Sequence, residues 1–297
     1  MSIRILTAAA AVCVGLGLTM HGPASAQQNV PKSAAKETMT PGGARNDVLY
    51  FWANHMGMLR GVQERDSIGT LHYVGTGTIS VNGQPCRLSR YDASINYQVS
   101  GMRVDYACTL PNGQNFEEIQ VVGAEYAWNE VGGLGAGLVP GKGQAVPMKA
   151  AFAERAIRLW AGPQGAVKAA MMAGENTRIG VEANRTTVTF PIPRVAGAVA
   201  KATLLNGPIN GLCTRNCAER VEVRNGDVVT EFTYSNYADH NDPEEQLDAF
   251  FPGRIVEKRG AATLLDLTVT RTETANIYIV VPVPPAVKSA GPAVVQQ

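Results

Sequence analysis

Alternation of apolar and polar residues is the feature of this sequence that most limits its fold. In 95–99 and 102–108 every second residue is apolar, and polar residues predominate between them. A period of two gives a strand one buried face and one solvated face. Asn82-Gly83, Asn112-Gly113 and Asn225-Gly226 are dipeptides that favour tight hairpin turns. The pattern predicts antiparallel meanders rather than parallel strands joined by helices.

The predicted strands fall into two blocks, one on each side of a central helical region. They cover 70–80, 95–99, 102–108, 116–122 and 125–130 in the first block, and 178–182, 186–192, 201–205, 220–223, 228–237, 254–258 and 264–272 in the second. Neither block is expected to fold alone, and the chain is long enough to bury one large core. Between the blocks, 132–143 is rich in glycine and predicts a mobile loop.

Helices are predicted at the N-terminus and at the centre of the chain. In 46–63 apolar residues recur every three or four positions, and Asn46 or Asp47 is placed to cap the helix. A second helix is predicted over 148–160 and a short third one over 165–174, with Gly162-Pro163 between them. We therefore expect a single α+β domain over 44–280, in which a curved antiparallel sheet is covered by the N-terminal helix and the central helical pair.

The first residues predict export. Arg4 precedes an uncharged apolar stretch over 5–18, and Ala24-Ser25-Ala26 resembles a signal-peptidase site. We expect a signal peptide over 1–26 that is cleaved after Ala26, and a periplasmic mature chain without a membrane span; an uncleaved anchor is the alternative. Residues 27–43 are expected to form a flexible leader, and 281–297 an extended tail rich in Pro and Ala.

Export changes how the cysteines are interpreted. Removal of the signal leaves Cys86, Cys108, Cys213 and Cys217, an even number in an oxidising compartment. Three pairings are possible, and we favour Cys86–Cys108 and Cys213–Cys217, which join neighbours in the sequence. A metal site is the weaker alternative because neither pair has C-x-x-C spacing or a histidine nearby.

Charge and motifs limit the function classes. The chain has 26 Lys and Arg against 25 Asp and Glu, so it lacks the basic excess typical of nucleic-acid binding. The oxygen-rich segment 239–245 could bind a hard cation, but a solvated loop is favoured because the spacing of a known cation loop is missing. No catalytic triad or paired-carboxylate pattern is recognised. We therefore expect a protein that is not an enzyme and has no cofactor or metal. The alternative is an unrecognised hydrolase that uses a carboxylate or a histidine such as His240.

Three segments resemble a known family. The run 102–128 contains Arg103-Val-Asp-Tyr106, a hairpin and a strand that ends in Trp128; 219–237 turns at Asn-Gly-Asp; and 251–255 reads Phe-Pro-Gly-Arg-Ile. Together they resemble the periplasmic lipoprotein-carrier (LolA-like) superfamily over about 68–275. The chain is also similar to exported domains that precede metallo-β-lactamase-fold hydrolases, although it lacks the H-x-H-x-D-H motif of such a hydrolase.

The resemblance implies an unclosed half-barrel whose concave face, under helical lids, receives an acyl chain. Arg103 stands at the family's arginine position and is the candidate for a polar latch on the lid, although an ordinary solvated strand arginine is the alternative. The leading hypothesis is a non-catalytic carrier of a hydrophobic ligand or lipoprotein. The alternative is an accessory module for an exported hydrolase or an envelope complex. A core role is the default for the apolar pocket candidates, which are Trp52, Met56, Leu59, Trp128, Phe152, Leu159 and Trp160.

Overall fold

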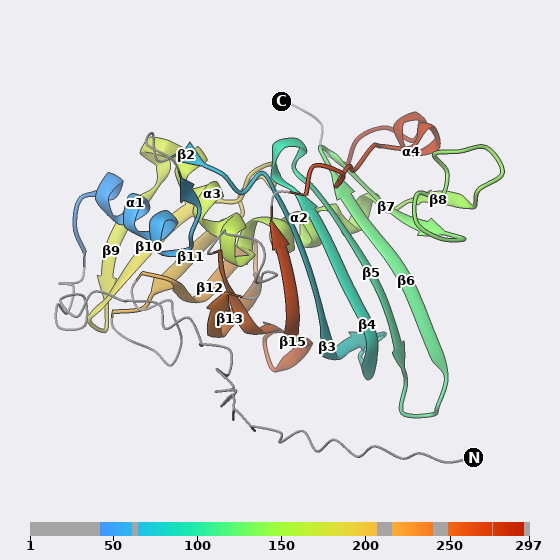
Figure 1. Cartoon of the computed structure of the whole chain (residues 1–297), viewed down its shortest axis with the longest axis horizontal. Helices are drawn as coiled ribbons and strands as arrows, with labels where there is room; N and C mark the ends of the chain where they lie inside the picture. Colours follow the sequence, from blue (N-terminus) through green and yellow to red (C-terminus); the bar gives the residue numbers. More distant parts are fainter. Residues whose placement is uncertain (1–41, 61–64, 207–215, 240–248, 275, 294–297) are drawn as a thin grey trace, which may run out of the picture. The chain divides into compact units, whose positions relative to one another are not determined.

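The computed structural model describes residues 42–60, 65–206, 216–239, 249–274 and 276–293, and these residues form a single large sheet with a few helices (Figure 1). Thirteen of the described strands follow the order β8-β7-β6-β5-β4-β3-β15-β14-β13-β12-β11-β10-β9. Every neighbouring pair is antiparallel, and β8 and β9 are the two outer edges, so the sheet is unclosed. The predicted α+β class and the open antiparallel sheet are confirmed.

Most of the described strands match a predicted strand and several are longer, but most of 84–96 and all of 144–147 were not predicted to be strands. They are β3 (Thr70–Val81), β4 (Gln84–Asn96), β5 (Gly101–Thr109), β6 (Asn115–Gly123), β7 (Tyr126–Val131), β8 (Gln144–Pro147), β9 (Arg178–Glu182), β10 (Arg185–Pro191), β11 (Val199–Leu204), β12 (Ala218–Asn225), β13 (Val228–Asp239), β14 (Phe250–Arg259) and β15 (Ala262–Thr274). A separate pair is formed by β1 (Leu59–Arg60) and β2 (Arg65–Asp66).

The chain reaches this order by a path that crosses the sheet once. Strands β3 to β8 run outward from the middle of the sheet to one edge. The helices α2 (Phe152–Ala161) and α3 (Pro163–Ala173) then lead to the opposite edge, and β9 to β15 return to the middle. The two meanders meet where β15 pairs with β3.

Two of the predicted hairpin turns lie at the expected dipeptides. Val81 pairs with Gln84 across Asn82-Gly83, and both turn residues have positive φ, as this type of turn requires. Asn112-Gly113 lies in the turn between β5 and β6. The third turn is one residue later than expected, because Asn225 itself pairs with Val228.

Several element boundaries differ from the prediction. The expected strand over 95–99 is instead the end of β4 followed by a 3-10 turn, η1 (Tyr97–Val99), which Asn96 caps by accepting a hydrogen bond from the Gln98 N–H at 3.0 Å. The expected helix over 148–160 starts as a 3-10 turn, η2 (Lys149–Ala151), before α2. Another 3-10 turn, η3 (Gly174–Asn176), follows α3.

The N-terminal helix α1 (Arg45–His55) is shorter than predicted. It ends because Gly57 takes a left-handed conformation, with φ of 68°. The Gly57 N–H donates to the Asn54 carbonyl at 2.9 Å, and the Met58 N–H donates to the Ala53 carbonyl at 3.0 Å, which together stop the helix. The expected cap is also wrong, because the N-cap residue is Ala44 and it makes no side-chain capping bond.

The C-terminal segment is more ordered than the predicted extended tail. It contains the short helix α4 (Pro285–Ser289), which contacts β7 and β8. Val281 and Val287 are buried in a small apolar cluster with Val121, Trp128 and Ala145. The described part of this tail therefore packs on the sheet.

The two faces of the sheet are distinguished by their cross-strand rows, because directly opposed residues lie on the same face. One row runs through Leu71, Ile95, Met102, Val122 and Ala127, all of which are buried in the main core together with side chains of the helices. We call this the inner face.

The next row belongs to the opposite, outer face. It runs through Glu273, His72, Ser94, Arg103, Val121 and Trp128. The small apolar cluster at the C-terminal tail covers part of this row. The inner and outer faces thus carry separate apolar cores.

Candidate functional site

The space between the inner face and the helices contains most of the predicted pocket residues. They are Trp52, Met56, Leu59, Phe152, Leu159 and Trp160, which come from α1, the α1–β1 connection, β1 and α2, and all belong to the main core or pack against it. Trp52 and Trp160 are 0 and 1% exposed. The structure therefore brings these residues together.

Aromatic rings from the sheet line the same space. The Tyr73 ring lies 5.0 Å from the Phe251 ring and 6.0 Å from the Tyr91 ring, measured between centroids. Tyr97 lies 6.1 Å from Trp160 of α2. Aromatic groups from β3, β4, β14 and η1 thus form an apolar surface beneath the helices.

Trp128 does not share this space with Trp52 and Trp160. It pairs with Val121, which pairs with Arg103, so it lies on the outer face. The hypothesis that all three tryptophans line one cavity is wrong, because Trp128 is separated from the other two by the sheet itself. Residue spacing along the chain could not reveal this, because the face of β7 depends on the register of its pairing.

Arg103 also lies on the outer face, so it does not reach the helices. Its Nη2 lies 2.9 Å from Oε1 of Glu130, whose side chain is fully buried, and its Nη1 donates to the Val280 carbonyl at 3.4 Å. The expected latch on the helical lid is therefore wrong for Arg103. This arginine contacts the C-terminal segment instead.

A different arginine joins the helices to the sheet. Arg155 of α2 is buried, and its Nη1 donates to the carbonyls of Val121 at 3.1 Å and Trp128 at 2.7 Å. Its Nη2 donates to Oδ1 of Asn129 at 2.5 Å. These direct partners carry no charge, and burial lowers the pKa of Arg155 to about 10, although Glu118 attracts the guanidinium. Arg155 was not among the predicted site residues.

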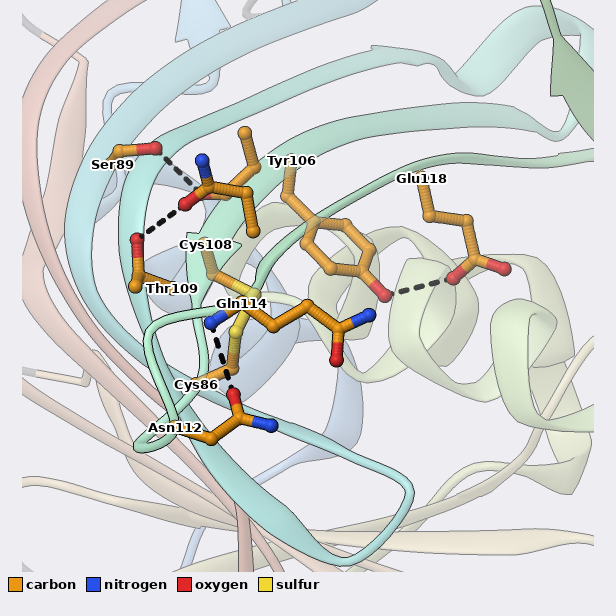
Figure 2. The surroundings of a disulfide bond; sticks show 10 residues. Cys86, Ser89, Tyr106, Cys108, Thr109, Asn112, Gln114 and Glu118 are labelled. Carbon is orange, nitrogen blue, oxygen red and sulfur yellow. Dashed lines mark hydrogen bonds between the residues drawn. A yellow bond between two sulfur atoms is a disulfide. The ribbon is translucent and has the colours of Figure 1, made fainter.

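Glu118 connects this arginine to a polar network under α2. It accepts hydrogen bonds from the Tyr106 hydroxyl at 2.8 Å (Figure 2), from Gln120 Nε2 at 2.6 Å and from Asn129 Nδ2 at 2.6 Å. The pKa of Tyr106 is raised, first by burial and then by the charge of Glu118. The network ties β5, β6 and β7 to one carboxylate.

A second arginine of α2 reaches the other meander. Arg158 donates to Glu257 of β14 from Nε at 2.8 Å and from Nη2 at 3.2 Å, and Glu257 is only 1% exposed. Burial acts to lower the pKa of Arg158, but the charge of Glu257 and its hydrogen bonds outweigh burial, so the pKa is raised. Nearby, Glu154 accepts a hydrogen bond from Arg259 at 3.1 Å. Helix α2 thus bridges both halves of the sheet.

Helix α3 has polar attachments of its own. Lys168 forms an ion pair with Asp66 of β2, and its ammonium lies 4.9 Å from the centre of the Tyr97 ring. Burial lowers the pKa of Lys168, and the hydrogen bond to Asp66 opposes this shift. Gln164 donates to the Phe250 carbonyl at 3.0 Å.

The first predicted disulfide is confirmed. Cys86 of β4 and Cys108 of β5 are bonded, with their Cα atoms 5.5 Å apart, on the inner face near the β5–β6 turn (Figure 2). In the second predicted pair, Cys217 is buried, whereas Cys213 lies outside the described residues.

A histidine of β3 has two charged neighbours. His72 lies between two carboxylates on the outer face, with Nε2 3.0 Å from Asp92 and Nδ1 3.5 Å from Glu273. This cluster could not be predicted from the sequence because its members come from three different strands. Asp239 ends β13, and the rest of the 239–245 segment, His240 included, lies outside the described residues.

Three of the pockets formed by described residues have no predicted ligand-binding residue in their lining. One of about 440 Å³ lies beside Glu219, Tyr234 and Tyr237, and one of about 400 Å³ lies beside Arg87 and Pro111. The third, of about 630 Å³, lies where β6 extends beyond the end of β7. The space under the helices is filled by side chains in this conformation.

Within the described part of the chain, no group of three or more His, Cys, Asp or Glu side chains is arranged to hold a metal ion. None of the described helices is both long and apolar enough to cross a membrane. The sequence matches neither a protein-family model nor a curated protein. The geometry of the helix-covered inner face is therefore the basis for the function proposed below.

Proposed function

We propose that the protein is a periplasmic, non-catalytic carrier of a hydrophobic ligand such as a lipid or lipoprotein acyl chain, similar to the LolA-like carriers. The observation that carries the proposal is the way in which the inner face is covered. Helices α2 and α3 lie over an aromatic-lined surface and are attached to it by side-chain hydrogen bonds and apolar contacts. Neither helix is part of the strand ladder.

A cover of this kind can separate while the sheet stays intact. Lifting α2 would break the bonds of Arg155 to the Val121 and Trp128 carbonyls and the ion pair of Arg158 with Glu257. Every strand pairing would remain, because the helices contribute no backbone hydrogen bonds to the ladder. The buried arginines would then regain water, which offsets part of the cost of opening.

The surface exposed by this movement suits an acyl chain. Tyr97 would lose Trp160 as a neighbour, and the rings of Tyr73, Tyr91 and Phe251 in the same core would become available to the ligand. Each methylene group buried there contributes about 0.8 kcal/mol. An acyl chain can therefore replace the apolar side of the helices, with the closed form as the empty state.

The proposal is tested by locking the cover. In Glu154→Cys/Arg259→Cys, a short bis-maleimide joins α2 to β14 at the position of a partly exposed ion pair. The control, Arg254→Cys/Asp266→Cys, joins β14 to β15 within the sheet, also in place of an ion pair. Binding of fluorescently labelled palmitate is measured before and after cross-linking, with reagent-treated wild type as a further reference.

We expect the locked α2–β14 variant to bind palmitate about tenfold more weakly than the same variant before cross-linking. The cross-linked β14–β15 control should bind as wild type does, because it does not restrain the helices. Undiminished binding by the locked variant would place the ligand elsewhere. A delipidated wild-type protein that binds no palmitate would refute the carrier function itself.

A further inference from the structure

The pocket of about 630 Å³ lies beside a part of β6 that has no strand partner, among the described residues, on the side away from β5. Strand β7 pairs with β6 only from Ile119 to Gly123, whereas β6 begins at Asn115. On its other side, β6 pairs with β5 from Asn115 to Val122. In an antiparallel sheet, every second residue of such an edge points its N–H and C=O groups outward. We call 115–118 and the adjoining pocket the β6 edge groove.

Carboxylates surround this groove. Glu117 is exposed, and Asp105, Glu118 and Glu130 also line the groove, with Arg90 as the only lysine or arginine among its described lining residues. Arg90 is already bonded to Asp105 at 2.7 Å, and the buried side chain of Glu130 is paired with Arg103 at 2.9 Å. Glu117 and Glu118 are therefore the carboxylates of the groove that have no bonded lysine or arginine among the described residues. A positively charged ligand would therefore meet an excess of negative charge.

Apolar side chains form the other wall. Val131 and Leu134 line the groove and are 55% and 54% exposed. Further along the same segment, Val139, Val146 and Met148 are also exposed. Exposed apolar residues gathered at one edge of a sheet are typical of a protein interaction surface.

We propose that the β6 edge groove binds an extended segment of a partner protein in which basic and apolar residues alternate. The segment would add to β6 as a strand and continue the line of β7 beyond Val131. Its basic side chains would lie on the face of Glu117, and its apolar side chains would contact Val131 and Leu134. The acidic groove disfavours an anionic membrane surface, which attracts basic residues.

This site differs from the proposed acyl-binding face. It requires no movement of the helices, and its open edge is accessible in the described conformation. Locking α2 with the cross-link described above should therefore leave peptide binding unchanged.

The test uses a synthetic peptide of about eight residues in which Lys and Val alternate. A Lys–Pro peptide has the same charge but lacks every second N–H and cannot complete a ladder. Binding of each peptide to the isotope-labelled mature protein is followed by NMR, which also locates the perturbed amides. Glu117→Lys reverses the exposed charge in the groove, and Asp227→Lys makes the same change in the distant, exposed β12–β13 turn.

The Lys–Val peptide should bind and perturb residues 115–118 and 131–134. Glu117→Lys should weaken its binding about tenfold, whereas Asp227→Lys should leave it unchanged. Equal binding of the Lys–Pro peptide would show that charge alone acts and would overturn strand addition. Absence of binding, perturbation elsewhere, or equal weakening by both variants would also refute the proposal.

Discussion

Arg155 shows how a single residue can be decisive and still be overlooked in a sequence. It lies on α2 one turn after Phe152 and one turn before Leu159, so the helical period assigns it to the buried face. The sequence therefore held a signal, a charged residue at an apolar position. Its partners, the carbonyls of Val121 and Trp128, could not be predicted, because any residue supplies a carbonyl and only the tertiary fold selects these two.

His72 gives a prediction at the same scale. The hydrogen bond to Asp92 is the main cause of its raised pKa, burial opposes the shift, and the charges of Asp92 and Glu273 add to it, while Arg271 acts against it. The folded protein therefore binds this proton more tightly than the unfolded chain. The stabilisation is complete below the ordinary histidine pKa of about 6.5 and is lost as pH rises through the raised value.

We accordingly expect His72→Gln to lower the free energy of unfolding most at acidic pH, with the difference from wild type shrinking as pH rises through that window. Urea unfolding of both proteins from about pH 5 to about pH 9 measures this difference. Asp92→Asn should remove most of the pH dependence because it removes the main partner. A deficit that is constant across this range would show that His72 acts by packing alone.

At the scale of elements, local backbone irregularities explain where the predicted strands and helices differ from the structure. The long strand β4 was missed except for its end because its register against β5 shifts between Leu88 and Arg90. Leu88 and Tyr91 are both buried although three positions separate them, so the period of two is interrupted. Helix α1 was overestimated for the opposite reason: the apolar spacing continues past Gly57, but the backbone turns there.

A second irregularity, at Gly77 in β3, carries a prediction. Gly77 has a φ of 147°, and a Cβ added there would lie 2.0 Å from the Asp266 carbonyl oxygen of β15. Gly83, in the β3–β4 turn, also has positive φ, but a Cβ there would meet nothing within 4 Å. Backbone strain is thus common to both sites, whereas steric overlap is confined to Gly77.

Gly77→Ala should therefore lower the free energy of unfolding by about 3 kcal/mol or more, and Gly83→Ala by about 1 kcal/mol. Urea denaturation of the two variants and the wild type checks both values. Equal losses in the two variants would mean that β15 can move away from β3 at little cost.

At the scale of the whole molecule, the sequence predicts which strands are neighbours within each meander but not the strand pairing that joins the two meanders. Alternation and turn dipeptides predict antiparallel neighbours within a block, because such pairings are local. The pairing of β3 with β15 joins residues near 75 to residues near 269, and no local pattern specifies it. The same holds for the outer-face core, which depends on how the C-terminal segment packs against Trp128.

The shared ladder and the common inner core predict that both meanders unfold together. A variant that retains only Trp52, which contacts Phe190 of β10, reports on the second meander, and one that retains only Trp128 of β7 reports on the first. Their fluorescence midpoints in urea should agree with each other and with the loss of far-ultraviolet circular dichroism. Two separated midpoints would show that the meanders are independent folding units.

The meeting of β3 and β15 also sets an order of events during synthesis. Among the thirteen strands, β3 is synthesised first and β15 last. The edge of β3 that pairs with β15 therefore has no partner strand during most of translation. A nascent chain interrupted before residue 262 would present that long edge, with its unpaired N–H and C=O groups, to other chains. The last strand to be made is the one that protects the first from aggregation.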